Sequence, residues 1–291
     1  MFPDVRLSNI DERRSNLTYK NIVGDCLTEI QKLDRNSISL IMTSPPYADA
    51  RKKLYGGPKP DKYVEWFIPI ANEIKKVIKP DGTFIINIKE KVVKGERHTY
   101  VLELIQAMRK NGWLWTEEFI WHKKNCFPGK WPNRFRDAWE RCLQFNVNKK
   151  FKMNQDSVKV PIGDWSEARL KSLSSTDKER DDSETGSKFG KKVSNWIGKE
   201  TVYPSNVLHL PTECGNKGHS AVYPKTLPDF FIKLFTDEGD TVLDPFEGSG
   251  TTGIAAVSLN RNYIGIDLSQ KYSDRSKTRI ENYSQKVDWL I

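Results

Sequence analysis

Close cysteine pairs and long apolar runs are both missing from the sequence. The cysteines lie far apart, so neither a disulfide framework nor a Cys-x-x-Cys zinc ribbon is expected; they are Cys26, Cys126, Cys142 and Cys214. We interpret them as buried free thiols and expect no metal site. No run of about 18 apolar residues exists, and the start of the chain lacks the apolar core of a signal peptide. These absences favour a cytoplasmic protein.

Basic residues outnumber acidic ones and give a net charge of +9 over 291 residues. A basic balance favours a polyanionic partner, although many basic proteins merely carry a solvated lysine-rich face. The charge is concentrated at 123–152, where nine Lys and Arg residues stand against Asp137 and Glu140, with aromatic rings between them. Basic and aromatic side chains together can hold phosphates and stack on bases. A solvated edge over a few core aromatics is the alternative.

Hydrophobic periodicity predicts an alternation of strands and helices, as in one large α/β domain. The predicted strands are 19–23, 38–42, 83–88, 113–121, 241–243 and 263–267. The predicted helices are 26–37 with a turn, 63–78 behind Asp61 as N-cap, 100–108, 227–235, 251–259 and one from about 269. The aromatic stripe of the second helix is assigned to the core. Other segments are an arm at 1–18, a lid-like loop at 48–60, a turn at Pro80-Asp81-Gly82 and a charge-dense loop or insertion at 166–192.

A rigid corner is predicted at the end of the strand 38–42. Thr43-Ser44-Pro45-Pro46-Tyr47 follows that strand directly. Each proline has a fixed φ and no N–H, and each keeps the residue before it extended. The corner therefore carries a hydroxyl before the prolines and an aromatic ring after them. Open α/β sheets bind their ligands at such strand ends. A proline-rich turn whose tyrosine covers the core is the alternative.

A glycine-rich turn lies between the predicted strand 241–243 and the helix that follows it. Gly248 to Gly253 matches Gly-x-Gly-x-x-Gly, and Asp267 stands 19 residues after Gly248, at the end of the next strand. Alone, this pattern suggests a nicotinamide or flavin dinucleotide. Only 24 residues follow Asp267, however, which is too few for a second nucleotide-binding half.

The residues before the glycine turn favour a different ligand. Asp244-Pro245-Phe246-Glu247 adds negative charge that a pyrophosphate would not favour. The ammonium group of an amino acid, in contrast, needs an acceptor. A nucleoside joined to an amino acid through a sulfonium is S-adenosylmethionine, which we expect as the cofactor.

The two motifs together resemble those of a known enzyme family. Asp244 to Thr252 resembles the cofactor motif of the DNA amino-methyltransferases, and Thr43 to Tyr47 resembles their catalytic motif. The order of catalytic motif, basic middle segment and cofactor motif is that of the β group of this family. The resemblance covers about 19–147 and 202–285 and does not include 148–201.

This resemblance implies an α/β fold with a circularly permuted, Rossmann-like methyltransferase sheet, mostly parallel with one antiparallel strand. It places the strand before Asp244 beside the strand that ends at Ser44. It also implies a catalytic half at 19–122, an inserted, basic DNA-recognition region at 123–201 and a cofactor-binding half at 202–291 of the same domain.

Site residues are carried over from the family by position. The expected catalytic residues are Ser44, Pro45, Pro46 and Tyr47. The methionine part of the cofactor would be surrounded by Asp244, Phe246, Gly248, Gly250, Thr251 and Thr252, and Thr43 would also bind the cofactor. Asp267 would bind the ribose, and Asp25 and Cys26 would flank the adenine. Lys225 would lie near the cofactor, although the His-Pro and Lys-Pro pairs of the family are here His219-Ser220 and Lys225-Thr226. Expected DNA contacts are Lys123, Lys124, Lys130, Arg134 and Arg136.

The corner suits methyl transfer to an exocyclic amine. The lone pair of such an amine is delocalised into the ring, and acceptors on its two N–H bonds favour a tetrahedral nitrogen; Ser44 Oγ and the Pro45 carbonyl are such acceptors. Tyr47 can stack on the base, which must flip out of the duplex. No cysteine follows a proline in the corner, which disfavours ring-carbon methylation. Deamination would need His-x-Glu with Pro-Cys-x-x-Cys, and neither occurs.

The sequence therefore predicts a DNA (cytosine-N4)-methyltransferase acting on double-stranded DNA. We expect it in a restriction-modification system, beside an endonuclease that acts on the same site without direct contact. Family members with Ser before the prolines mostly act on cytosine N4, and those with Asp on adenine N6, so adenine is the alternative target. A DNA-binding module with an inactive methyltransferase fold is the alternative from another class. RNA or protein amide methyltransferases usually carry Asn-Pro-Pro-Tyr, which this chain lacks.

Overall fold

The computed structural model describes residues 17–50, 56–126, 129–163, 171–174, 197–213 and 223–288. The chain divides into two units, Met1–Asn154 with Asn206–Ile291, and Gln155–Ser205. Cys214, His219 and most of the predicted arm and of 166–192 lie outside the described residues. Across the described part of the chain, no helix is both long enough and apolar enough to cross a membrane.

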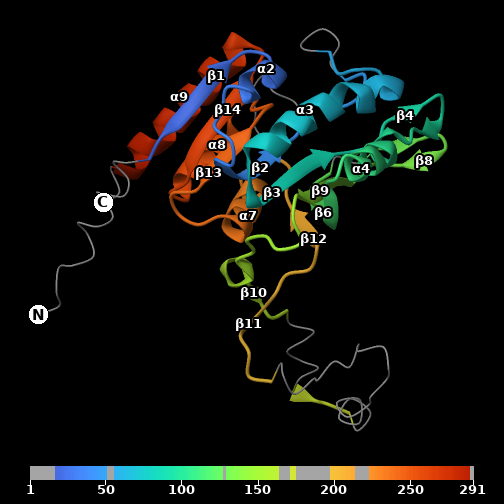
Figure 1. Ribbon diagram of the computed structural model, residues 1–291. Coiled ribbons are helices and arrows are strands. Elements are labelled where there is room, and N and C mark those ends of the chain that lie inside the picture. The colour runs from blue at the N-terminus through green and yellow to red at the C-terminus, as the bar shows by residue number, and fades with distance from the viewer. Residues whose placement is uncertain are drawn as a thin grey trace, which may run out of the picture. The chain divides into compact units, whose positions relative to one another are not determined.

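The larger unit is built on an eight-stranded sheet in the order β1-β14-β13-β2-β3-β9-β6-β12 (Figure 1). In sheet order these strands are Tyr19–Val23, Asn262–Asp267, Thr241–Asp244, Ile38–Thr43, Ile78–Ile88, Trp139–Asn146, Leu114–Lys123 and Val207–Leu210. All neighbouring strands pair in parallel except at β9, which is antiparallel to both β3 and β6. This arrangement confirms the predicted permuted sheet with one reversed strand.

Six helices of the described residues accompany the sheet and fall into two groups. They are α2 (Cys26–Ile30), α3 (Tyr63–Val77), α4 (Tyr100–Lys110), α7 (Thr226–Phe235), α8 (Thr251–Ser258) and α9 (Gln270–Asp288). The helices α2, α3 and α4 pack in one row, and α7, α8 and α9 in another. Parallel crossovers are right-handed, and the chain moves along the sheet in opposite directions in the two halves, so the rows cover opposite faces (Figure 1).

The connections that leave the neighbouring strands β2 and β13 run in opposite directions along the sheet. The crossover from β2 leads through α3 to β3, whereas that from β13 leads through α8 to β14, on the other side. The two strands are paired, with Val242 opposite Leu40 and Leu243 opposite Ile41. Connections that leave neighbouring strands in opposite directions open a crevice at their carboxyl ends. Both sequence motifs begin at the carboxyl ends of these two strands.

The core confirms the structural role of the α3 stripe. Tyr63 and Phe67 are fully buried, and Phe67 stacks on Phe84 of β3. The helix begins differently from the prediction, however. The 3-10 turn η1 (Pro60–Lys62) precedes α3, and the residue at the N-cap is Lys62. Asp61 was wrong as the cap, because its carboxylate instead pairs with His98.

The predicted turn at 80–82 lies inside the strand β3. Ile38 of β2 pairs with Ile78, but Leu40 pairs with Thr83, so β3 contains extra residues that bulge out of the ladder. The Asp81 carbonyl accepts a hydrogen bond from the Lys152 N–H. Pro80, Asp81 and Gly82 therefore form a bulge within one strand instead of a turn between two elements.

Two short hairpins adjoin the sheet beyond β3 and β6. They are β4–β5 (Val92–Val93 with Glu96–Arg97) and β7–β8 (Lys130–Trp131 with Arg134–Phe135). Figure 1 shows β4 and β8 side by side, and Arg97 bonds Asp137, just after β8 (2.7 Å). The strand β9 lies within the predicted DNA-recognition region 123–201 but belongs to the main sheet. The predicted boundaries of the three regions, 19–122, 123–201 and 202–291, stay a prediction.

The smaller unit contains the 3-10 turn η2 (Gln155–Val158) and a two-stranded ladder. In this ladder β10 (Val160–Pro161) runs antiparallel to β11 (Thr201–Val202). Tyr203 donates a hydrogen bond to the carboxylate of Asp156 (3.0 Å).

Candidate active site

The two sequence motifs meet at the carboxyl ends of β2 and β13. The Thr43 hydroxyl donates a 2.6 Å hydrogen bond to Asp244 Oδ1, and both residues are buried. Ser44 follows Thr43 directly, and the glycine turn follows Asp244. The catalytic corner and the cofactor turn therefore share one edge of the sheet, although they lie about two hundred residues apart in sequence.

Asp244 is the centre of a buried hydrogen-bond cluster. Its Oδ1 also accepts the Phe246 N–H (3.1 Å), and its Oδ2 accepts the hydroxyls of Thr252 (2.7 Å) and Tyr223 (3.3 Å). Burial raises the pKa of this carboxyl to about 6, against the lowering effect of the donors. One carboxylate thus ties together β2, β13, α8 and the segment before α7.

Tyr223 is a member of this cluster that sequence reasoning missed, and Lys225 does not join it. The Tyr223 hydroxyl also lies 2.5 Å from the Thr252 hydroxyl. Lys225 Nζ bonds both carboxylate oxygens of Asp229, one turn along α7, and lies 5.7 Å from the ring centre of Tyr283. The only signal for Tyr223 was its position two residues before the family lysine.

The glycine turn depends on two left-handed residues. Gly248 and Gly250 have φ of 52° and 75°. A Cβ on Gly250 would lie 2.1 Å from Ser276 Oγ of α9, so only glycine lets that helix pack here. Asp267 lies against the turn, because its carboxylate accepts the N–H groups of Gly248 (3.0 Å) and Ser269 (2.7 Å).

The remaining predicted cofactor residues lie beside Asp267 or at the turn. Val23 of β1 pairs with Asp267, and the Gly24 N–H bonds the Asp267 carbonyl (3.0 Å). Asp25 then caps α2, and Cys26 is buried, which raises the pKa of its thiol to about 12. Phe246 packs against Trp66 of α3, at 5.7 Å between ring centres.

The residues at the start of α8 fit the carboxylate of a zwitterionic amino-acid ligand. Thr251 Oγ1 is buried and has no hydrogen-bond partner within the described residues. The helix α8 begins at the same residue, and no side chain caps its first N–H groups. Free N–H groups at a helix N-terminus bind carboxylates. A carboxylate that also approaches Thr251 would satisfy both features, as the amino-acid part of S-adenosylmethionine can.

Glu247 is a second buried carboxylate, and no role was predicted for it. Its Oε2 accepts hydrogen bonds from Asn21 (2.7 Å), Ser276 (2.9 Å) and the Tyr263 hydroxyl (3.4 Å). A Cβ on Gly265 would lie only 2.0 Å from this oxygen. Glu247 Oε1 is buried without a partner in the described part of the chain. Burial, with the nearby charges of Asp244 and Asp267, raises the pKa of Glu247 to about 8.

The catalytic corner carries its own polar network. The Ser44 hydroxyl donates to the Tyr47 oxygen (3.5 Å), and the Tyr47 hydroxyl donates to Glu140 Oε2 of β9 (2.6 Å). Burial and the charge of Glu140 raise the pKa of Tyr47 well above its usual value, so the phenol stays protonated. Pro45 is buried and Pro46 half-buried beside it.

Lys123 and Glu140 form a second part of this network. Lys123 Nζ bonds Glu140 Oε1 at 2.6 Å, and both side chains are mostly buried. Lys123 was predicted to contact DNA, but its ammonium is directed at this carboxylate. Glu140 was noted in the sequence only as an exception in a basic segment.

The other predicted DNA-binding residues lie on or near the β7–β8 hairpin. Arg134 stacks over the Trp131 ring at 4.6 Å, and Arg136 is exposed. Phe135, between them, has 91% of its surface exposed. Lys124 is exposed after β6, and Lys130 begins β7, although its side chain lies outside the described part.

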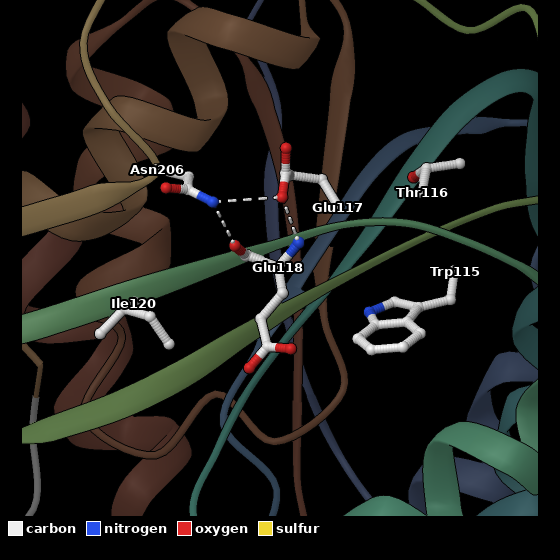
Figure 2. Close-up of a pocket in the computed structure, with 6 residues that line it drawn as sticks. All are labelled: Trp115, Thr116, Glu117, Glu118, Ile120 and Asn206. Atoms are coloured by element: carbon white, nitrogen blue, oxygen red, sulfur yellow. Dashed lines mark hydrogen bonds between the residues drawn. The ribbon is translucent and has the colours of Figure 1, made fainter. Parts of the chain in front are cut away.

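A hollow of about 470 Å³ lies elsewhere on the sheet (Figure 2). Its lining residues are Trp115, Thr116, Glu117, Glu118, Ile120 and Asn206. Figure 2 shows the Asn206 amide reaching Glu117 (3.4 Å) and the Glu118 carbonyl (3.2 Å). Most of these residues belong to the first part of β6, away from the carboxyl ends where the motifs meet. This hollow therefore lies apart from the candidate active site at the motifs.

The fold and the site together define an α/β methyltransferase in permuted order. Residues 38–278 match the model of a family described as DNA methylase, which unites N6 and N4 enzymes. The Type II methyltransferase M.PvuII of Proteus hauseri is 32% identical over 284 residues, covering 88% of this chain and 82% of the relative. The chain belongs to the DNA methylase family and is a DNA amino-methyltransferase of the β group.

Solved structures agree with this assignment. The PvuII DNA methyltransferase, described as cytosine-N4-specific, superposes with a TM-score of 0.67 at 26% identity, covering 92% of this chain and 90% of that one. A putative DNA modification methylase from Thermus thermophilus, complexed with S-adenosyl-L-methionine, shares the fold with a TM-score of 0.61 at 20% identity, over 91% of this chain and 94% of that one. S-adenosylmethionine is the methyl donor of this family.

Replacing Tyr223 tests which residue of the 223–225 segment supports the cofactor site. Tyr223→Phe removes one donor from Asp244 and should weaken S-adenosylmethionine binding about tenfold, because a hydrogen bond to a charged group contributes about 1.5 kcal/mol. Lys225→Met should change the affinity less than twofold. Titration calorimetry measures both. Equal losses, or a larger loss for Lys225→Met, would contradict the assignment.

The buried Glu247 predicts a pH-dependent stability. Its pKa is about 8 in the folded protein against 4.5 for an ordinary glutamate, so between these values the folded protein holds a proton that the unfolded chain has released. Stability should therefore fall as pH rises through this window, by at most about 1.4 kcal/mol per pH unit. Glu247→Gln should flatten the dependence in urea unfolding from pH 5 to 8.5, whereas Glu96→Gln, at an exposed site, should not.

Proposed function

We propose that the protein transfers a methyl group from S-adenosylmethionine to the exocyclic N4 of cytosine in double-stranded DNA. The observation that carries this proposal is the 2.6 Å hydrogen bond between Thr43 and Asp244, which joins the motif at Ser44 to the motif at Asp244. Ser44 before the prolines and the likeness to a cytosine-N4-specific enzyme favour cytosine. Adenine N6 is the second candidate, because the family unites both kinds of enzyme.

The cofactor supplies an electrophilic methyl group when it binds. The α8 N-terminus and Thr251 would hold its carboxylate, the Asp244 cluster would lie beside the methionine part, and Asp267, next to Gly248, would accept the ribose hydroxyls. Asp25 and Cys26, next to Asp267, flank the adenine. These assignments are supported by the position of the residues at the carboxyl ends of β1, β14 and β13, which are neighbours in the sheet.

The corner prepares the target amine for attack. Ser44 Oγ and the Pro45 carbonyl accept its two N–H bonds and favour a tetrahedral nitrogen, whose lone pair then points away from the ring plane. Tyr47 presents its ring to the base. The N–CH₃ bond forms as the S–CH₃ bond breaks and leaves a neutral thioether. The methylated nitrogen is transiently cationic and acidic and loses its proton to water, so positioning and directed dipoles supply most of the acceleration.

The β7–β8 hairpin contacts the DNA beside the site. Arg134, Arg136 and Lys124 hold phosphates, and the exposed Phe135 contacts bases near the position that the flipped cytosine leaves. Contacts of this kind offset the few kcal/mol that base flipping costs. The Type II names of the relatives support a restriction-modification role. In that role the protein would act in the cytoplasm, beside an endonuclease that acts on the same sequence without touching it.

Identification of the modified nucleoside tests the function. The protein is incubated with genomic duplex DNA and S-adenosylmethionine carrying a labelled methyl group, and the digested nucleosides are separated by mass spectrometry. We expect label in N4-methylcytosine, and none with Ser44→Ala. Label in N6-methyladenine would establish the second candidate. Cofactor binding without any labelled base would mean that the fold is inactive and only binds DNA.

The β7–β8 hairpin makes separate predictions for charge and stacking. Arg136→Gln should weaken duplex binding and reduce the salt slope of log K by about one, because it removes one phosphate contact. Phe135→Ala should weaken binding with the slope unchanged. Lys20→Gln, on β1 at the far end of the sheet, is the charge-matched control and should have no effect. Fluorescence anisotropy at several salt concentrations measures all three.

A further inference from the structure

We propose that Glu140 is a positioning residue for methyl transfer, which acts through Tyr47 to make Ser44 a hydrogen-bond acceptor toward the target amine. This inference rests on the proposed function of the corner. Glu140 comes from β9, the reversed strand, and none of the sequence motifs includes it. Its side chain is buried beneath the corner.

The carboxylate of Glu140 is held at both oxygens. Oε2 accepts the Tyr47 hydroxyl and Oε1 accepts Lys123 Nζ, each at 2.6 Å. Lys123 stands on β6, next to β9, and its ammonium also lies 5.0 Å from the ring centre of Trp121. The neighbouring ammonium compensates the negative charge of the buried carboxylate. An ionised carboxylate can only accept hydrogen bonds.

This pairing fixes the direction of the whole chain of hydrogen bonds. Tyr47 has a single hydroxyl proton, which it donates to Glu140, so its oxygen can only accept from Ser44. Ser44 then directs its own proton at Tyr47 (3.5 Å). The lone pairs of Ser44 Oγ are left for an N–H of the target amine.

The opposite direction would oppose the reaction. If Tyr47 donated to Ser44, the Ser44 proton would be free to bond the lone pair of the amine, which is the pair that must attack the methyl group. Asn87 offers a second acceptor for Tyr47, but its Oδ1 lies at 3.4 Å. The Asn87 amide nitrogen is engaged with the Arg141 carbonyl (3.2 Å), which keeps Oδ1 toward Tyr47. The short bond to Glu140 therefore sets the direction.

Glu140→Gln removes the acceptor that fixes the direction of the network, without changing its shape. Lys123 will hold the amide oxygen, so the amide NH₂ faces Tyr47 and donates to it. Tyr47→Phe is the companion variant, because it keeps the ring that faces the base and removes only the hydroxyl. Glu117→Gln, on the exposed face of β6, is the matched control.

The test measures single-turnover methylation of duplex DNA together with the dissociation constants of S-adenosylmethionine and DNA. Glu140→Gln and Tyr47→Phe should each lower the methylation rate about 10- to 100-fold and leave both constants within about twofold. The double variant should be no slower than Tyr47→Phe alone, because Glu140 acts only through the phenol. The control should match the wild type.

Several outcomes would overturn the inference. These are a wild-type rate in Glu140→Gln, multiplied losses in the double variant, or a loss that appears in the dissociation constants instead of the rate. If Glu140→Gln does not fold, Tyr47→Phe decides, since a wild-type rate there also refutes the proposal. A wild-type protein that methylates no base refutes the proposed function and this inference with it, whereas an active wild type with unaffected variants refutes the inference alone.

Discussion

The buried Asp244 carboxylate is the constraint on which the site depends. It accepts four hydrogen bonds from four different parts of the chain, including the last residue of β2. A buried carboxylate that lost these donors would carry a large desolvation cost, so the segments that supply them must meet in one arrangement. The geometry between the catalytic corner and the cofactor turn is thus set by a polar centre and not by apolar packing alone.

Three buried carboxylates near the site are stabilised in three different ways. Asp244 is surrounded by neutral donors, Glu140 is paired with Lys123, and Glu247 has an elevated pKa that keeps it protonated at neutral pH. The negative charge that remains near the cofactor turn therefore comes mainly from Asp244 and Asp267. That distribution suits a cationic sulfonium and an ammonium group, because nearby negative charge stabilises each cation even without direct contact.

Much of the fold could be predicted because its signals are local. The strands around Leu40 and Leu243 are short apolar runs, and the prolines and glycines that follow them act within a few residues. The roles of Tyr223 and Glu140 could not be predicted, because each depends on a partner in a distant element. The prediction of Asp61 as an N-cap was wrong for a related reason: its carboxylate suits a helix start but pairs with the distant His98 instead. The bulge in β3 likewise became visible only through its pairing with β2.

The central strand pair has a consequence for how the protein forms. Leu40 and Val242 are neighbours in the sheet, yet about two hundred residues separate them in sequence. During synthesis, one edge of β2 has no native partner until β13, about two hundred residues later, has left the ribosome. An apolar strand with an open edge is a template for unwanted association. Nascent chains of this protein should therefore need protection by chaperones for longer than a methyltransferase in unpermuted order would.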